Sequence, residues 1–418
     1  MFNKKNLSIP ASEDKELELK RENPLEFKLD FDDEKPVKAL FFLIAGLGED
    51  NNQSYQDHLA EFLVKEYQVA VIRVSYNNIG LRPQNGATFV MDAKDKEIYL
   101  RVGEGLNINF ADNFFPPHDL SQQETYQACA ILNNAIQERQ NRGFYKKGTK
   151  IGISISVQPA RNEYLNFGVL QAMDILNVLQ FIKKNPPFIL EKDYKTIMFG
   201  SSHGGYLALL AAKFAPWLID GVLENSAYVK PQMRLFGLGR DVDYIKECEF
   251  QAGEFFEHVV LCCVTKTPFS LDTNSKYYFS SDHHHIRDIF NEAHLRTQAN
   301  YPKPYYISYH SIQDELDSAQ NKEQMFELLK ELDFKGSLHI IKDESEVDGT
   351  FIKSLKHGMG MSLKMLIQKE LPTLLALKKR KLSKNTPREI LYKGEKLDYL
   401  FKEAHGGGQF ELELFRHD

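Results

Sequence analysis

A glycine-flanked serine motif, Gly200-Ser201-Ser202-His203-Gly204, constrains this chain more than any other feature. The apolar run Thr196–Phe199 precedes it, and the helix-forming segment YLALLAAKF follows it after Gly205. A serine on such a sharp strand-to-helix turn has a strained backbone that lifts its hydroxyl above the sheet, and small neighbours are needed where backbones pass close. Free N–H groups at the start of the helix favour an anion there. We therefore expect Ser202 to be a nucleophile; without this context the motif would be an ordinary glycine-rich turn.

Strand and helix patterns alternate on both sides of the motif. Val37–Ala45 and Val69–Ser75 are nearly continuous apolar runs, typical of strands that are covered on both faces, and residues 54–66 between them have helical spacing. This alternation predicts an α/β fold with a doubly wound, mostly parallel sheet. The other expected core elements are helices at 164–183, 204–214, 320–332 and from 361, and strands at 196–200, 221–225, 305–310 and 337–342.

Two irregular segments interrupt this alternation. Residues 79–161 contain a short alternating piece at 97–102 and one helical stretch at 122–139, and residues 229–302 are mostly helical and rich in aromatic residues. We expect both to be insertions that form a helical cap. The core is then expected in 1–78, 162–228 and 303–377, with a C-terminal tail at 378–418 that ends in strand-like sequence. Residues 16–31 alternate apolar and charged residues, which predicts an antiparallel hairpin or edge strands.

Candidates for an acid and a base follow the serine along the chain. Asp314 lies on the loop that leaves the predicted strand 305–310, and His357 lies on the loop after the predicted strand 337–342. Both loops leave the same edge of a parallel sheet. An imidazole there would accept the serine proton, and a carboxylate on its other nitrogen would fix the tautomer. We expect a catalytic set of Ser202, Asp314 and His357.

Other residues compete for these roles. Asp317, Asp343 and Asp348 are alternatives for the acid. His310 and His339 lie within apolar strands, where a buried structural histidine is the simpler interpretation. His203 adjoins the serine, but consecutive side chains at such a turn point in different directions. Its backbone N–H is therefore more useful than its ring.

An oxyanion site needs two N–H donors. The first expected donor is the N–H of His203, directly after the serine. The second expected donor is the N–H of Leu47, in the turn Ala45-Gly46-Leu47-Gly48 after the first apolar strand. The alternative is that Gly46 and Gly48 only form the turn.

Bulk composition excludes several classes of function. The formal net charge of −6 does not favour a nucleic-acid partner. We expect no membrane span, because the chain lacks about 18 consecutive apolar residues, and the N-terminus lacks a signal-peptide pattern, which predicts a cytoplasmic protein. The four cysteines show neither metal-ligand spacing nor the density of a disulfide framework.

No cofactor or metal is expected. The run Asp282-His283-His284-His285 could suggest a metal site, but adjacent histidines diverge, so a solvated face is the simpler interpretation. The basic stretch 378–384 is likewise interpreted as a solvated linker.

The elbow at 200–205, the turn at 45–48 and the loops at Asp314 and His357 together resemble the α/β-hydrolase superfamily over about residues 30 to 375. Its esterase and prolyl-oligopeptidase-like branches are most similar, because an HG-x-x-D loop holds their acid and a late HG motif holds their base. Ser311 replaces the glycine of the first motif here. Ala45 stands where many relatives have histidine, which leaves the second oxyanion donor open.

A narrower resemblance covers nearly the whole chain. The stretches GSSHGGYLA, NEYLNFGVLQAMD, YPKPYYISYHS and KHGMGMS are similar to a family of motile epsilonproteobacteria that is associated with flagellin-glycosylation gene clusters. This resemblance implies an acyl group linked to a sugar as the substrate.

Three functional hypotheses follow. The first is a serine hydrolase that cleaves an ester or similar acyl bond through an acyl-Ser202 intermediate, with a small acyl or acyl-sugar substrate. The second is an acyltransferase that moves the acyl group to a sugar of a flagellin-type glycan. The third is a non-catalytic accessory protein on a hydrolase scaffold, which predicts a missing or misplaced member of the catalytic set.

Overall fold

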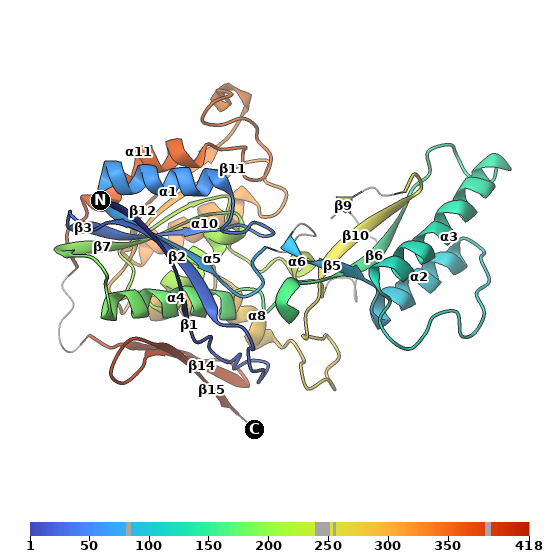
Figure 1. Ribbon diagram of the computed structural model, residues 1–418, viewed down its shortest axis with the longest axis horizontal. Helices are drawn as coiled ribbons and strands as arrows, with labels where there is room; N and C mark the ends of the chain where they lie inside the picture. Colours follow the sequence, from blue (N-terminus) through green and yellow to red (C-terminus); the bar gives the residue numbers. More distant parts are fainter. Residues whose placement is uncertain (81–84, 239–250, 254–255, 381–385, 418) are drawn as a thin grey trace. The chain divides into compact units, whose positions relative to one another are not determined.

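A computed structural model describes all residues except 81–84, 239–250, 254–255, 381–385 and 418 (Figure 1). The chain divides into two compact units, and each is described here by itself. The first comprises residues 1–79, 166–231 and 279–418, and the second comprises 80–165 and 232–278. Helices α8 (Ser281–Arg287) and α9 (Glu292–Gln298), which the sequence analysis assigned to the second insertion, therefore belong to the first unit.

The first unit contains an eight-stranded sheet in the order β1-β2-β4-β3-β7-β8-β11-β12. The six strands from β4 to β12 run parallel, whereas β1 and β2 are antiparallel to their neighbours. This is the arrangement of an α/β-hydrolase fold, as predicted. Its strands are β1 (Phe2–Ile9), β2 (Leu25–Asp32), β3 (Val37–Ile44), β4 (Val69–Ser75), β7 (Leu190–Ser201), β8 (Gly221–Asn225), β11 (Tyr305–Ser311) and β12 (Lys335–Ile341).

Helices cover both faces of this sheet. On one face, α1 (Ser54–Tyr67) and α11 (Leu363–Leu375) pack on side chains such as Phe41 and Leu43, and α4 (Val169–Lys184) lies on the other side (Figure 1). Helix α5 (His203–Phe214) contacts β7 and β8, and α10 (Ala319–Glu331) contacts β11 and β12. Burial on both faces explains the nearly continuous apolar sequence of the central strands.

The N-terminal segment agrees only in part with the sequence expectation: residues 25–32 form an antiparallel strand near the sheet edge, but residues 16–24 do not form its partner. Strand β2 pairs with β1, whereas the chain before β2 forms a turn in which Asp14 and Leu19 exchange backbone hydrogen bonds. The alternating pattern there was misleading because Glu16 is buried and forms an ion pair with Arg287 at 2.6 Å. Because Glu16 is charged but buried, the turn that contains it has the alternating sequence pattern of an amphipathic strand.

The second unit contains a four-stranded sheet in the order β5-β6-β10-β9. The alternating piece expected at 97–102 is helical, because Asp92 forms a capping box that starts α2. Strand β10 lies in a segment expected to be mostly helical, and it pairs in parallel with β6 from the other insertion. The elements are β5 (Thr88–Val90), α2 (Ala93–Gly105), α3 (Gln122–Asn141), β6 (Ile151–Gln158), α6 (Met233–Phe236), β9 (Gln251–Gly253) and β10 (Val259–Thr265).

The C-terminal tail forms a three-stranded antiparallel sheet of β13 (Glu389–Tyr392), β14 (Leu397–Glu403) and β15 (Phe410–Arg416). The ring of Phe401 stacks on Phe214 of α5 with centroids 3.9 Å apart. The tail therefore belongs to the hydrophobic core of the first unit. No helix in the part of the chain that the structure describes is long and apolar enough to cross a membrane.

Two surface interpretations from the sequence hold only in part. Asp282 and His283 are buried, and the Asp282 carboxylate accepts hydrogen bonds from the N–H groups of Glu395 and Lys396, which anchors the C-terminal sheet. In the basic stretch, Lys378 and Lys379 are exposed as expected, whereas the half-buried Arg380 donates to Asp220 at 3.0 Å and to two backbone carbonyls. Residues 381–384 of that stretch lie outside the described residues.

Candidate active site

The elbow (residues 200–205) joins β7 to α5. Ser202 has φ 53° and ψ −122°, a conformation that residues with a Cβ rarely adopt. It is held there because its N–H donates to the carbonyl of Asn225 at 2.8 Å and its own carbonyl accepts the N–H of Tyr206 at 3.0 Å. The first bond continues the sheet and the second starts the helix.

Three glycines make this turn possible. A Cβ on Gly200 would lie 2.2 Å from the carbonyl carbon of Gly204, and a Cβ on Gly204 would lie 2.3 Å from the backbone oxygen of Ile44. A Cβ on Gly205 would lie 2.9 Å from the Cβ of Ala227. The three glycines are thus needed because the elbow passes close to the end of β3, close to the chain at the end of β8, and close to its own backbone.

The structure brings Ser202, His357 and Asp314 together. The Ser202 Oγ lies 2.7 Å from the Nε2 of His357, and the Nδ1 of that ring lies 2.9 Å from both carboxylate oxygens of Asp314. The serine comes from the end of β7, the acid follows β11, and the histidine follows β12. Because these strands are parallel, their carboxyl ends share one edge of the sheet.

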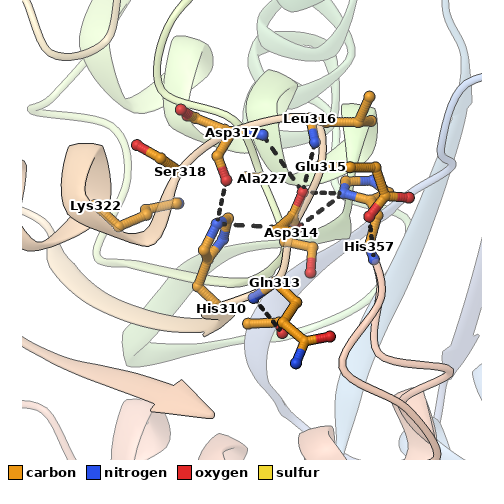
Figure 2. A network of polar contacts seen from close by, with 12 residues as sticks. Ala227, His310, Gln313, Asp314, Glu315, Leu316, Asp317, Ser318, Lys322 and His357 are labelled. Atoms are coloured by element: carbon orange, nitrogen blue, oxygen red, sulfur yellow. Dashed lines mark hydrogen bonds and ion pairs between the residues drawn. The ribbon is translucent and has the colours of Figure 1, made fainter. Parts of the chain in front are cut away.

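Asp314 lies in the acid loop (residues 311–317), which Figure 2 shows from close by. Burial alone would raise the pKa of the Asp314 carboxyl, but the hydrogen bond and charge of His357 outweigh burial and hold the pKa below its ordinary value. Its Oδ1 also accepts the N–H of Leu316 at 3.0 Å. The carboxylate is thus kept ionised next to the imidazole.

The rival acids have other partners. Asp317 accepts the backbone N–H of Val229 and the side-chain amide of Asn321. Asp343 and Asp348 are exposed, and each caps the turn that follows it. Of the four candidates, the structure places Asp314 against the ring of His357.

The base loop (residues 355–360) is fixed by its neighbours. Glu315 accepts the N–H of His357 at 3.1 Å, and the Ser226 hydroxyl accepts the N–H of Gly358 at 3.0 Å. Asn225 donates to the carbonyl of Gly358 at 3.1 Å and to the hydroxyl of Ser201 at 3.3 Å. These residues were not among the predicted site residues, although Asn225 and Ser226 mark the end of β8, where polar residues of a parallel sheet gather at the site.

The ring of His203 points away from the serine into the core. Its Nε2 lies 2.9 Å from Oε1 of Gln171, and its Nδ1 contacts the hydroxyl of Tyr228. Burial lowers the pKa of this imidazole to about 3, so it is neutral. The backbone after the serine is therefore anchored by a buried side chain.

The turn after β3 lies beside the elbow. Tyr76 donates to the carbonyl of Ala45 at 2.8 Å, and Glu49 accepts the N–H of Gly46 at 2.8 Å. A Cβ on Gly46 would lie 3.5 Å from the carbonyl oxygen of Ser201. This places the turn that carries Leu47 next to the elbow that carries His203, the two predicted sources of oxyanion donors.

Two further predicted features can be located. His339 stacks on Tyr309 with ring centroids 4.3 Å apart, but it is only half-buried on the edge strand β12, whereas a buried histidine was expected. His310 is buried as expected and also lies 3.8 Å from the carboxylate of Asp314, a contact that its interpretation as a core histidine did not predict. Among the described residues, no group of three or more His, Cys, Asp or Glu side chains is arranged to hold a metal ion.

Solved structures similar to this chain include several hydrolases. An acylaminoacyl peptidase from Pyrococcus horikoshii is 10% identical, with a TM-score of 0.46, and the match covers 92% of this chain and 43% of the peptidase. A puromycin-hydrolyzing peptidase from Mycobacterium tuberculosis is 9% identical, with a TM-score of 0.46, over 90% of this chain and 40% of that one. A ferulic acid esterase is 11% identical, with a TM-score of 0.41, over 90% and 97%.

The chain thus spans less than half the length of the two peptidases. No curated protein matches it. A family described as "Protein of unknown function (DUF2920)" matches residues 5–414. Because this match spans nearly all of the 418 residues, the chain belongs to the DUF2920 family.

Proposed function

We propose that this protein is a serine hydrolase that cleaves an ester or similar acyl bond through an acyl-Ser202 intermediate. The observation that carries the proposal is the continuous contact from the Ser202 hydroxyl, through both nitrogens of His357, to the Asp314 carboxylate. A hydroxyl is a weak nucleophile until a base removes its proton during attack.

The proposed chemistry proceeds in two steps. As the Ser202 Oγ bonds to the acyl carbon, its proton moves to the Nε2 of His357, which then gives it to the leaving oxygen as the ester bond breaks. A water molecule next attacks the acyl-enzyme, passes its proton to the same nitrogen, and releases the acid as Ser202 is reprotonated. Asp314 holds the Nδ1–H and stabilises the imidazolium formed in each step.

The N–H groups of Leu47 and His203 are the proposed oxyanion donors. The anchoring of His203 by Gln171 and Tyr228, and of the turn at 45–46 by Tyr76 and Glu49, supports this assignment. Loss of one donor costs about 3 kcal/mol of transition-state stabilisation in acyl transfer. Preorganised backbone groups supply this stabilisation without reorganisation during the reaction.

The proposal also concerns the acylated substrate and the molecule that accepts its acyl group. The resemblance to the flagellin-glycosylation family favours an acylated sugar as substrate, with a sugar hydroxyl as an alternative acceptor to water. Products from an acetylated sugar can be followed by mass spectrometry with and without a second, unacylated sugar. Free acid in both reactions supports hydrolysis, whereas an acylated acceptor that forms at the expense of free acid supports transfer.

Turnover of a p-nitrophenyl acyl ester series tests the proposal as a whole. We expect the wild type and Ser201→Ala to release nitrophenol and Ser202→Ala to release none above background. Ser201→Ala is the matched control because it removes the hydroxyl of the adjacent residue. The Oγ of Ser201 contacts Asn225. Equal release by Ser202→Ala and wild type would contradict the proposal. No release by any folded variant with any ester would favour the accessory role.

A further inference from the structure

His310 lies directly behind the acid. It is near the end of β11, and its side chain is fully buried. Figure 2 shows its ring between the acid loop and α10, with Nε2 2.9 Å from the backbone oxygen of Asp317 and 3.8 Å from Oδ2 of Asp314. Because a carbonyl oxygen only accepts hydrogen bonds, Nε2 carries the ring hydrogen. The other nitrogen, Nδ1, has no hydrogen-bond partner among the described residues.

This hydrogen bond closes the acid loop. It joins His310 to a backbone carbonyl seven residues later, and Asp314 lies at the centre of the segment between them. Asp314 in turn accepts the N–H of Leu316 at 3.0 Å and contacts the N–H of Asp317 at 3.4 Å. The ring of His310 therefore fixes the end of the acid loop at Asp317, and the N–H groups at this end orient the Asp314 carboxylate.

Burial and the charge of Lys322 keep the ring of His310 neutral. The groups that face the ring are Lys322 from α10, Glu224 from β8, and the Asp314 carboxylate and Asp317 backbone oxygen of the acid loop, and of these only Lys322 lowers the pKa of His310. Burial, followed by the charge of Lys322, lowers the pKa of His310, and Glu224 pairs with Lys322. A neutral ring leaves the Asp314 charge available to His357, whereas a second imidazolium would compete for it.

We propose that His310 is a positioning residue that acts through Asp314. Its N–H closes the acid loop and directs a positive dipole at the carboxylate, and so holds that carboxylate against the Nδ1–H of His357. The catalytic consequence rests on the proposed function, whereas the structural consequence for the His357–Asp314 hydrogen bond does not. The two can therefore be measured separately.

Three variants isolate this role. His310→Phe keeps a ring of similar size without the donor, whereas His310→Gln can present an amide N–H near the position of Nε2. His339→Phe is the matched control, because His339 lies on the adjacent strand β12 and stacks on Tyr309. Should His310→Phe not fold, His310→Asn replaces it, because its shorter amide reaches less far than that of Gln.

The structural measurement is the downfield proton NMR resonance of the Nδ1–H that His357 shares with Asp314. We expect this resonance in wild type, His310→Gln and His339→Phe, and its loss through exchange broadening in His310→Phe. The catalytic measurement is the rate constant of labelling by a fluorophosphonate. A displacement of about 1 Å in a catalytic group can cost as much as about 100-fold in rate, so we expect a loss approaching this size in His310→Phe and recovery in His310→Gln.

An unchanged resonance in folded His310→Phe, or equal loss in the Gln and Phe variants, would overturn the positioning role. A resonance that is lost only in His310→Phe, together with a wild type that no fluorophosphonate labels, would support the positioning role and reject the serine hydrolase. The failure of the inference is thus distinguishable from the failure of the proposed function.

Discussion

At position 202 a side chain with a Cβ occupies backbone space that favours glycine. Such conformations cost about 1–3 kcal/mol, and they persist where the surrounding structure enforces them. Here the elbow is held by the sheet through Asn225 and by the first turn of α5. The strain is a feature of the site itself.

Because of this strain, we expect the usual order of stability of alanine and glycine variants to be reversed at position 202. Glycine normally destabilises a folded chain relative to alanine by about 0.5–1 kcal/mol. Because a Cβ is strained at φ 53°, we expect Ser202→Gly to be more stable than Ser202→Ala by about 1 kcal/mol in chemical unfolding. Alanine as the more stable variant would mean that the elbow is not strained.

The Asp314 carboxylate is predicted to select the tautomer of His357. Asp314→Asn keeps the size of the side chain but removes its charge, and the equivalent change in a serine protease lowers kcat about 10⁴-fold. We expect a loss of similar size in ester turnover. Asp343→Asn, the matched control at an exposed rival position, should keep wild-type turnover. A small effect at Asp314, or an equal effect at both positions, would count against the assigned acid.

The elements around the site owe their positions to close backbone contacts. Helix α5 approaches the end of β3 so closely that Gly204 has no room for a Cβ. The turn that carries Leu47 leaves the same end of β3. The packing of these two elements therefore sets both the elbow and the proposed oxyanion site.

Gly204→Ala is predicted to separate these elements. Its methyl group would lie 2.3 Å from the backbone oxygen of Ile44, so we expect a lower melting temperature together with lost turnover. Gly105→Ala is the matched control: a Cβ on Gly105, at the end of α2, meets nothing within 4 Å. The control should keep or slightly raise the melting temperature. A Gly204→Ala protein as stable and active as wild type would contradict the packing described here.

Local patterns in the sequence predicted these elements well. The strand, turn and helix around Ser202, and the strands before Asp314 and His357, were predictable because each is a short apolar run with its own turn residues. Strand β10 was missed although Val259–Thr265 is also a short apolar run, because the surrounding segment was interpreted as mostly helical; its pairing with β6 of the other insertion has no local signal. The strand pattern alone did not show the contact of His310 with Asp314, since a buried histidine in a strand looks the same whether it contacts the core or the acid, although the HG-x-x-D resemblance places this histidine in the motif that holds the acid.

Distant segments of the first unit meet at a buried ion pair. Arg287 of α8 donates to both carboxylate oxygens of Glu16 and to the backbone carbonyls of Phe167 and Asn166. Tyr399 of β14 donates to the same carboxylate at 2.8 Å. The N-terminal turn, the start of α4, α8 and the C-terminal sheet are thus joined at one point. To predict this arrangement from the sequence, one would need to know that the charged residues Glu16 and Asp282 are buried.

Loss of one partner of a buried ion pair typically costs about 3–5 kcal/mol. We expect a loss of this size in the unfolding free energy of Arg287→Met. Arg296→Met, the matched control on α9, removes an exposed pair with Glu292 and should cost less than about 1 kcal/mol. Equal losses in the two variants would contradict a structural role for the buried pair.

The same pair predicts a pH dependence of stability. Burial opposes ionisation of Glu16, but Arg287 outweighs it and holds the pKa of Glu16 below its ordinary value. Its contribution is therefore complete above the ordinary carboxyl pKa and is lost as the pH falls through the lowered one. Acid unfolding should show the stability gap between wild type and Arg287→Met narrowing in that range. A gap that widens with acid would contradict the assignment.

Site-mapped fluorophosphonate labelling determines whether Ser202 is the nucleophile. Folded wild type, Ser201→Ala and Ser202→Ala are treated with the probe, and the modified peptide is identified by mass spectrometry. We expect one adduct, on Ser202, in the first two proteins and none in the third. Folded wild type without an adduct, or an adduct that persists in Ser202→Ala, would contradict it.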